Sequence, residues 1–389
     1  MLHLATHALP PRDKGESHRA ATTLELMYDL ASVIAIAAAA AGLHHAVAEG
    51  HAADGIVGFL CSFFIIWWAW LNYTWFASAY DDGSTEFRLL SMLIMFGALI
   101  VAAGIPEVFK GNPIYLAVFG YVVMRAGMVL LWLAAARGDP ARRVTALRYA
   151  RGIGIMQIYW VAVNLIWGGA GLTTLMPLFL AGVVGELAVP VLAERHRATP
   201  WPRHHIIERY GLLNIIVLGE CFLAITAMFR LHEGSYMPDW HLMIFATLAA
   251  IITFGMWGVY FTDEDHLDTD FLPRALLWGY GHSVLFASGA AVGAGFAVVL
   301  EVFEHQAHID ERTAMIAIAI PLATYLAMLW LIRDLFCLRG WAKWFLLASA
   351  ILVLVSGFFL PLPLECMAII TATAALLRRG LACYRVAPR

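Results

Sequence analysis

The fifteen residues from Ile56 to Trp70, IVGFLCSFFIIWWAW, decide the fold class, because they contain neither a charged side chain nor a proline. Each such run crosses, or nearly crosses, a hydrocarbon core that needs about 20 helical residues. A backbone in lipid must satisfy its own hydrogen bonds, and the ten-residue alternation of a membrane barrel is absent. The sequence therefore predicts an all-α membrane protein. Comparable runs are Leu89 to Ala103, Ile215 to Met228 and Trp344 to Pro361.

The composition of the whole chain supports the same class. Of its 389 residues, 61% are hydrophobic and 14% are charged, which lies outside the balance of a soluble globular domain. Reading run by run, we expect about twelve transmembrane helices, at roughly 23–46, 55–78, 88–108, 113–136, 152–169, 174–194, 207–229, 241–261, 273–300, 313–334, 342–360 and 363–380.

The basic residues predict the orientation. With the N-terminus inside, 21 of the 25 basic residues fall in cytoplasmic segments, and three fall on the other side: Lys110, Arg230 and Arg312. Arg125 lies inside a helix. Under the positive-inside rule this asymmetry predicts that both termini lie in the cytoplasm. We expect a multi-pass protein of the inner (plasma) membrane. The lipid bilayer is thus the one partner that the sequence implies.

Two parts of the chain have a similar order of motifs. Glu25-Leu-Met-Tyr-Asp-Leu recurs in outline as Glu208-Arg-Tyr-Gly-Leu-Leu, and in each half an aromatic tract leads to acidic residues and an arginine. We expect two tandem six-helix repeats of the same orientation. The organisation is then a cytoplasmic N-terminal segment (1–22), a first repeat (23–194), a cytoplasmic linker (195–206), a second repeat (207–380) and a cytoplasmic tail (381–389).

The N-terminus and the cysteines allow other interpretations. A cleaved signal peptide is a rival explanation of the polar start, but Glu25 and Asp29 fall inside its would-be apolar region. The five cysteines are an odd number without metal-ligand spacing, which excludes a disulfide framework.

Four segments are more specific than composition requires. They are Glu25-Leu-Met-Tyr-Asp-Leu, the tract Trp67 to Phe76 with its acidic tail, the run Met95-Phe-Gly-Ala98 to Ile105-Pro-Glu107, and His204-His-Ile-Ile-Glu-Arg-Tyr-Gly-Leu-Leu-Asn-Ile-Ile-Val-Leu-Gly-Glu220. Together they resemble the bacterial low temperature requirement protein A family over nearly the whole chain. The opening segment departs from the family's aromatic pattern, with Met27 and a tract of alanines. The resemblance implies an uncharacterised multi-pass membrane protein linked by its family name to growth in the cold.

Ionisable residues inside the membrane are expensive, so they are the first candidates for function. Glu220 and Arg125 both lie near the middle of their helices, and an interhelical ion pair is the structural alternative to a solute or ion site. Glu186 precedes Pro190 by four residues, and the proline leaves a backbone carbonyl free to bind a ligand. His282 is a candidate because an imidazole can titrate near neutral pH. The alternative is that His282 is a core histidine with a hydrogen bond to a neighbouring carbonyl.

A second group lies where helices one and seven begin. Thr22-Thr-Leu-Glu25 fits a capping box, and Asp29 follows one turn later. Two carboxylates at this spacing repel unless one holds a proton or a cation pairs with it. A salt bridge from Asp29 to Arg209 or Arg88 is the structural explanation. With Glu208, this group completes the candidate solute or ion-binding residues: Glu220, Arg125, Glu25, Asp29, Glu208, Arg209, Glu186 and His282.

Other motifs are weaker. The acidic stretch 263–270 fails the EF-hand pattern at its third ligand, so a solvated turn is expected. Metal-like spacing also occurs among Glu304, His305, His308 and Glu311, but exposed polar turns share it. The aromatic residues from Trp67 to Trp75 are expected to form an interface belt and a packing surface. We expect no metal, no cofactor and no nucleic-acid partner.

These observations favour a secondary transporter or permease of an unknown small solute or ion, with a central site between the two halves. Proton coupling is one form that such transport could take. One alternative is a membrane enzyme that acts on a lipid or polyprenyl substrate, for which Glu25, Asp29, Asp81 and Asp82 must converge beside Arg88. Another is a structural or regulatory membrane protein. A homo-oligomer remains open beside a monomer.

Overall fold

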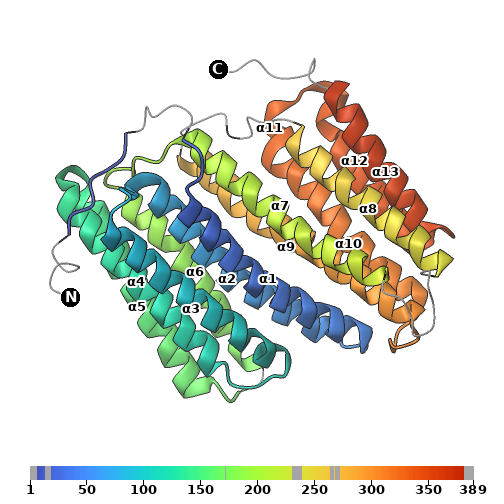
Figure 1. Ribbon diagram of the computed structural model, residues 1–389, viewed down its shortest axis with the longest axis horizontal. Coiled ribbons are helices and arrows are strands. Elements are labelled where there is room, and N and C mark those ends of the chain that lie inside the picture. The colour runs from blue at the N-terminus through green and yellow to red at the C-terminus, as the bar shows by residue number, and fades with distance from the viewer. Residues whose placement is uncertain are drawn as a thin grey trace. The chain divides into compact units, whose positions relative to one another are not determined.

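The computed structural model of the protein describes residues 7–13, 19–170, 172–229, 239–262, 267 and 272–380. Every regular element in these ranges is a helix, and they contain no strand, as the run of apolar segments predicts. The long helices, labelled in Figure 1, are α1 (Thr23–Ala48), α2 (Ala52–Tyr80), α3 (Thr85–Phe109), α4 (Tyr115–Gly138), α5 (Arg143–Trp167), α6 (Leu172–Glu194), α7 (Arg203–Met228), α8 (Trp240–Phe261), α9 (Leu272–Phe303), α10 (Glu311–Leu329), α12 (Phe345–Phe359) and α13 (Pro363–Arg378).

Short helices complete the connections. A 3-10 turn, Pro140–Arg142, leads into α5, and a π-helical turn, Trp330–Asp334, continues α10 into α11 (Leu335–Cys337). A second 3-10 turn, Gly340–Trp344, precedes α12.

Each predicted range contains a helix, but some of these helices are too short or too polar to count as candidate membrane spans. In the described ranges, ten helical segments are long and apolar enough to cross a membrane, and α5 and α13 are not among them. The sequence also placed the start of the fifth helix near residue 152, whereas α5 starts at Arg143. The basic residues before position 152 indicate a loop from sequence, but they form the first turns of α5, since long basic side chains are compatible with a helix at a membrane surface. A count of twelve spans therefore stays a prediction.

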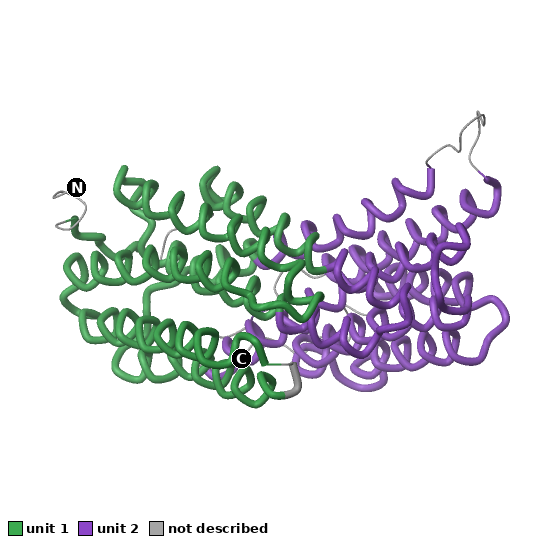
Figure 2. Tube along the Cα trace, turned by 90° about the horizontal axis from the view of Figure 1, so that it is seen from below, with its two compact units in different colours: residues 1–39, 62–209 green, residues 40–61, 210–389 purple. Residues whose placement is uncertain are grey.

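The chain divides into two compact units (Figure 2). Unit 1 comprises residues 1–39 and 62–209, and unit 2 comprises residues 40–61 and 210–389. In unit 1, α3 packs against α4, α4 against α5, and α5 against α6. In unit 2, α10 packs against both α9 and α12, while α13 packs against α8 and α12.

Glycines bring α3 and α4 of unit 1 close together. A Cβ atom at Gly104 would lie 2.5 Å from the backbone nitrogen of Ala117, and one at Gly120 would lie 2.7 Å from the carbonyl oxygen of Gly97. Small residues at such crossings let membrane helices pack through their backbones. This packing holds Arg125, on α4, inside unit 1, where its residue is 1% exposed.

Candidate functional site

The start of α1 carries the capping box that the sequence predicts. The carboxylate of Glu25 accepts a hydrogen bond from the Thr22 amide at 2.8 Å, and the Thr22 hydroxyl accepts one from the Glu25 amide at 3.2 Å. This reciprocal pair satisfies two amides that the first turn of a helix leaves free. The Glu25 side chain is fully buried, so its position is set by the helix start rather than by solvent.

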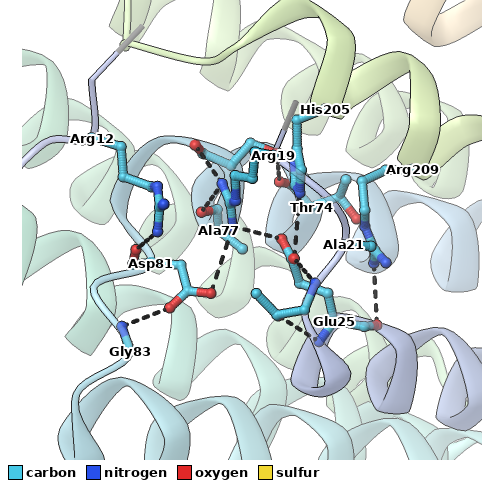
Figure 3. Close-up of polar contacts among 12 residues, drawn as sticks. Arg12, Arg19, Ala21, Glu25, Thr74, Ala77, Asp81, Gly83, His205 and Arg209 are labelled. Carbon is cyan, nitrogen blue, oxygen red and sulfur yellow. Dashed lines mark hydrogen bonds and ion pairs between the residues drawn. The ribbon is translucent and has the colours of Figure 1, made fainter. Parts of the chain in front are cut away.

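Arg19 joins this helix start to the end of α2 (Figure 3). Its guanidinium lies 3.2 Å from the Glu25 carboxylate and 3.6 Å from that of Asp81, and it donates to the Ser78 carbonyl at 2.9 Å. Cations are favoured at a helix C-terminus, where carbonyl groups lack partners. Burial raises the pKa of the Asp81 carboxyl above its ordinary value, although the amide of Gly83 donates to it and opposes that shift.

Asp29 forms the most complete ion pair of the region. Arg209, on α7, donates to both of its oxygens at 2.6 Å, and the indole nitrogen of Trp70 donates to it at 2.7 Å. Arg209 also donates to the backbone carbonyl of Glu25 at 3.2 Å. Bidentate pairs of this kind are stronger than single contacts. Of the two salt bridges predicted for Asp29, the structure confirms the one with Arg209.

His205 lies between Ser78 and Glu25. It is absent from the predicted binding residues, although it lies in the segment from His204 to Glu220. Its Nδ1 is 2.8 Å from the Ser78 hydroxyl, and its Nε2 is 3.3 Å from the Glu25 carboxylate. The Ser78 hydroxyl also lies 2.7 Å from the Thr74 carbonyl, to which it donates. We call the six residues Arg19, Glu25, Asp29, Asp81, His205 and Arg209 the ion cluster.

Two further groups border the ion cluster. Glu208 accepts a hydrogen bond from the Ala21 amide at 3.1 Å, just before α1 begins. The Arg12 guanidinium donates to the backbone carbonyl of Asp81. Glu208, a predicted binding residue, thus holds the backbone just before α1 through this hydrogen bond.

Deeper in unit 1, Arg125 is paired with Glu186. Two indole nitrogens also donate to that carboxylate, from Trp68 at 2.8 Å and from Trp160 at 3.1 Å. The predicted alternative, an ion pair between Arg125 and Glu220, is wrong for the described residues, because Glu186 on α6 is the partner of Arg125.

The aromatic tract before Asp81 does more than the predicted interface belt and packing. Trp68 and Trp70 are buried and donate to Glu186 and Asp29. A buried indole has one donor and needs an acceptor, and this is the signal that could have indicated carboxylate partners.

The two remaining predicted residues lie in unit 2. Glu220 is 8% exposed, and no hydrogen bond or ion pair joins its side chain to another described residue. His282 is confirmed as a bonded core histidine: its Nδ1 lies 2.7 Å from the Trp278 carbonyl and its Nε2 lies 3.2 Å from the Tyr260 hydroxyl.

Unit 2 also contains an apolar pocket of about 370 Å³, lined by α1, α2, α9 and α10. Its walls are aliphatic and aromatic, as at Leu43, Phe59 and Ile320, with a few hydroxyl groups. None of the predicted binding residues lines it. Such a wall suits an apolar group better than a polar solute.

The weaker motifs have mixed outcomes. Asp82 is near His7, at 3.1 Å, and does not join the ion cluster. The acidic stretch 263–270, which the sequence predicts to be a solvated turn, lies outside the described residues apart from Leu267. Glu304, His305, His308 and Glu311 form no ligand cluster among the described residues, but another group does, namely His44, His45 and Glu301.

Comparison with known proteins identifies the family of the chain. The family model of the bacterial low temperature requirement A protein matches residues 20–378. The chain belongs to this family. It is also 28% identical over 295 residues to the uncharacterized protein RA0937 of Rhizobium meliloti (strain 1021), a match that covers 71% of this chain and 68% of that protein.

Two of the low temperature requirement A segments recognised in the sequence contribute side chains to the ion cluster of unit 1. The opening segment supplies Glu25 and Asp29, and the second-half segment supplies His205 and Arg209. These residues are 180 positions apart in the chain at the Asp29–Arg209 pair, yet their side chains are in direct contact. Four of the six residues of the ion cluster therefore lie in segments that resemble the family.

Proposed function

We propose that this membrane protein is a secondary transporter that couples the movement of a small solute to protons, and that His205 in the ion cluster carries the proton. The observation that carries the proposal is the position of His205 between Ser78 and Glu25. Ionisable groups buried in membrane proteins are costly, and they are found along proton relays and ion paths.

The hydrogen bonds around His205 differ between its two protonation states. While the Ser78 hydroxyl donates to the Thr74 carbonyl, it can only accept from His205, so Nδ1 carries a proton. Nε2 then faces a carboxylate, and a second N–H there makes the contact favourable. In the neutral state with a proton on Nε2 alone, the Ser78 hydroxyl must turn to Nδ1 and the Thr74 carbonyl loses its donor.

The formal charge of the ion cluster supports the same conclusion. Its three carboxylates and two guanidinium groups sum to one negative charge, and a proton on His205 brings the sum to zero. Uncompensated charge in a buried site is costly. A proton on His205, on α7, offsets this charge and favours the contact of His205 with Glu25 on α1, so proton uptake is linked to the contact between the two helices. A change of protonation thereby changes helix packing, which is what coupling requires.

The proposal includes the finer topology predicted from the sequence. It comprises twelve spans in two six-helix repeats of the same orientation, in the inner membrane, with both termini in the cytoplasm. The basic residues and the order of the motifs support it. The lipid enzyme has less support, because Arg19, Arg209 and Trp70 occupy oxygens of the carboxylates that it would need.

Proteoliposomes with a trapped pH dye test the proposal. Pools of amino acids, sugars, nucleosides and inorganic ions are added in turn under a potassium diffusion potential. We expect at least one pool to cause protein-dependent proton flux. His205→Lys keeps the positive charge but holds its proton near neutral pH, so it should remain folded and lose the flux.

His204→Gln is the matched control, because His204 is the exposed neighbour of His205. This variant should retain the flux, and we expect it to restore growth in the cold to a deletion strain as well as the wild type. If His205→Lys keeps full flux, His205 does not exchange the proton. If no pool moves protons while the protein still restores growth, a structural or regulatory role replaces transport.

A further inference from the structure

We propose that His44, His45 and Glu301 form a binding site for a divalent transition metal such as Zn²⁺. The Nε2 of His44 lies 2.5 Å from Oε1 of Glu301, and the Nδ1 of His45 lies 3.6 Å from the same oxygen. All three ligand atoms lie within 4.8 Å of one another. Donor atoms on a tetrahedral zinc are about 3.3 Å apart, given Zn–N bonds of about 2.0 Å, so small side-chain movements suffice.

The donor set is suited to zinc. Imidazole nitrogens and carboxylate oxygens are common zinc ligands, and two histidines with one glutamate leave a fourth position for water or another ligand. His45 is the accessible member, with 68% of its side chain exposed, whereas His44 and Glu301 are 17% and 21% exposed. A metal ion can therefore reach the site from solvent.

The surrounding backbone favours a cation at this place. His44 and His45 lie near the end of α1, and Glu301 lies in the last turn of α9. Both helices thus direct their C-terminal, partially negative ends towards the site. The amide of His308 donates to the Ala48 carbonyl at 2.7 Å, which holds the loop after α9 against the end of α1. A bound ion would tie these two helix ends together within unit 2.

A simple hydrogen bond between His44 and Glu301 is the competing explanation, and zinc binding by the purified protein separates the two. The detergent-solubilised full chain, freed of its affinity tag and stripped with chelator, is titrated with Zn²⁺ against a chromophoric chelator. We expect one zinc ion per chain. Co²⁺ in its place should give visible d–d absorption without a thiolate charge-transfer band, because no cysteine belongs to the site.

Two variants probe the ligands. His45→Ala removes an exposed side chain and should fold normally, and Glu301→Gln keeps the size and a hydrogen-bond acceptor. Each should weaken zinc affinity at least about tenfold, since even outer-shell changes have effects of this size. Zinc should also raise the melting temperature of the wild type and not that of His45→Ala.

His241→Ala is the matched control, because His241 is another exposed histidine beside a carboxylate, 3.3 Å from Asp239, and no second histidine joins them among the described residues. Its zinc affinity should equal that of the wild type. The metal site is excluded if the wild type retains no more zinc than His45→Ala, or if His241→Ala weakens binding as much as the two ligand variants do. The inference does not depend on proton-coupled transport.

Discussion

Glu186 and Glu220 are two buried glutamates in predicted membrane spans with different surroundings. Glu186 neutralises Arg125 and accepts from two tryptophans, while Glu220 makes no such contact with any described residue. The same substitution should therefore have opposite consequences at the two positions. This comparison separates a structural ion pair from a carboxylate that is free for another role.

Glu186→Gln should destabilise the protein by about 3–5 kcal/mol, because it leaves the Arg125 guanidinium buried without a counter-charge. The apparent melting temperature in detergent measures this loss, and Arg125→Gln in the same chain should recover part of it. Glu220→Gln should be as stable as the wild type or more so, since it removes an unpaired buried charge. A large loss of stability in Glu220→Gln would show that this carboxylate has a partner outside the described residues.

At the scale of elements, backbone contact between α3 and α4 sets the position of Arg125. A methyl group at Gly104 would meet the Ala117 nitrogen at 2.5 Å, and a backbone atom cannot turn aside as a flexible side chain can. Gly104→Ala should therefore destabilise the protein by roughly 1–3 kcal/mol, in the range of other overpacking substitutions. Thermal unfolding in detergent measures the effect.

Gly154→Ala on α5 is the control for this substitution. A Cβ atom there would meet nothing within 4 Å, so only helix propensity should act, which favours alanine by up to about 1 kcal/mol. Equal melting temperatures for Gly104→Ala and Gly154→Ala would contradict close packing of α3 on α4.

For the whole molecule, the predicted topology depends on α5 and α13, which lack the apolar length of the other ten segments. Reporter fusions after residues 140, 198 and 389 should all report the cytoplasm, and fusions after 235 and 361 the opposite side. The side expected for each fusion follows from the excess of basic residues on the predicted cytoplasmic side. If the fusions after 140 and 198 disagree, α5 does not span the membrane, and if those after 361 and 389 agree, α13 does not.

The sequence by itself determined the properties that depend on neighbouring residues. A run such as Ile56 to Trp70 indicates a membrane helix from its own residues, because it is apolar over most of the length that a span needs. The capping box of Thr22 and Glu25 is likewise local, since it joins residues three apart. The family could be recognised for a similar reason, because its motifs are contiguous segments.

Only the tertiary structure decided which charges meet. Arg125 is 61 residues from Glu186, and Arg209 is 180 residues from Asp29. Whether such groups touch depends on how each helix is rotated and where it begins, and a shift of one residue turns a side chain by about 100° around a helix. The sequence proposed Glu220 as a partner for Arg125, and it indicated neither His205 nor the approach of His44 to Glu301, because helix rotation and register are set by packing among distant segments.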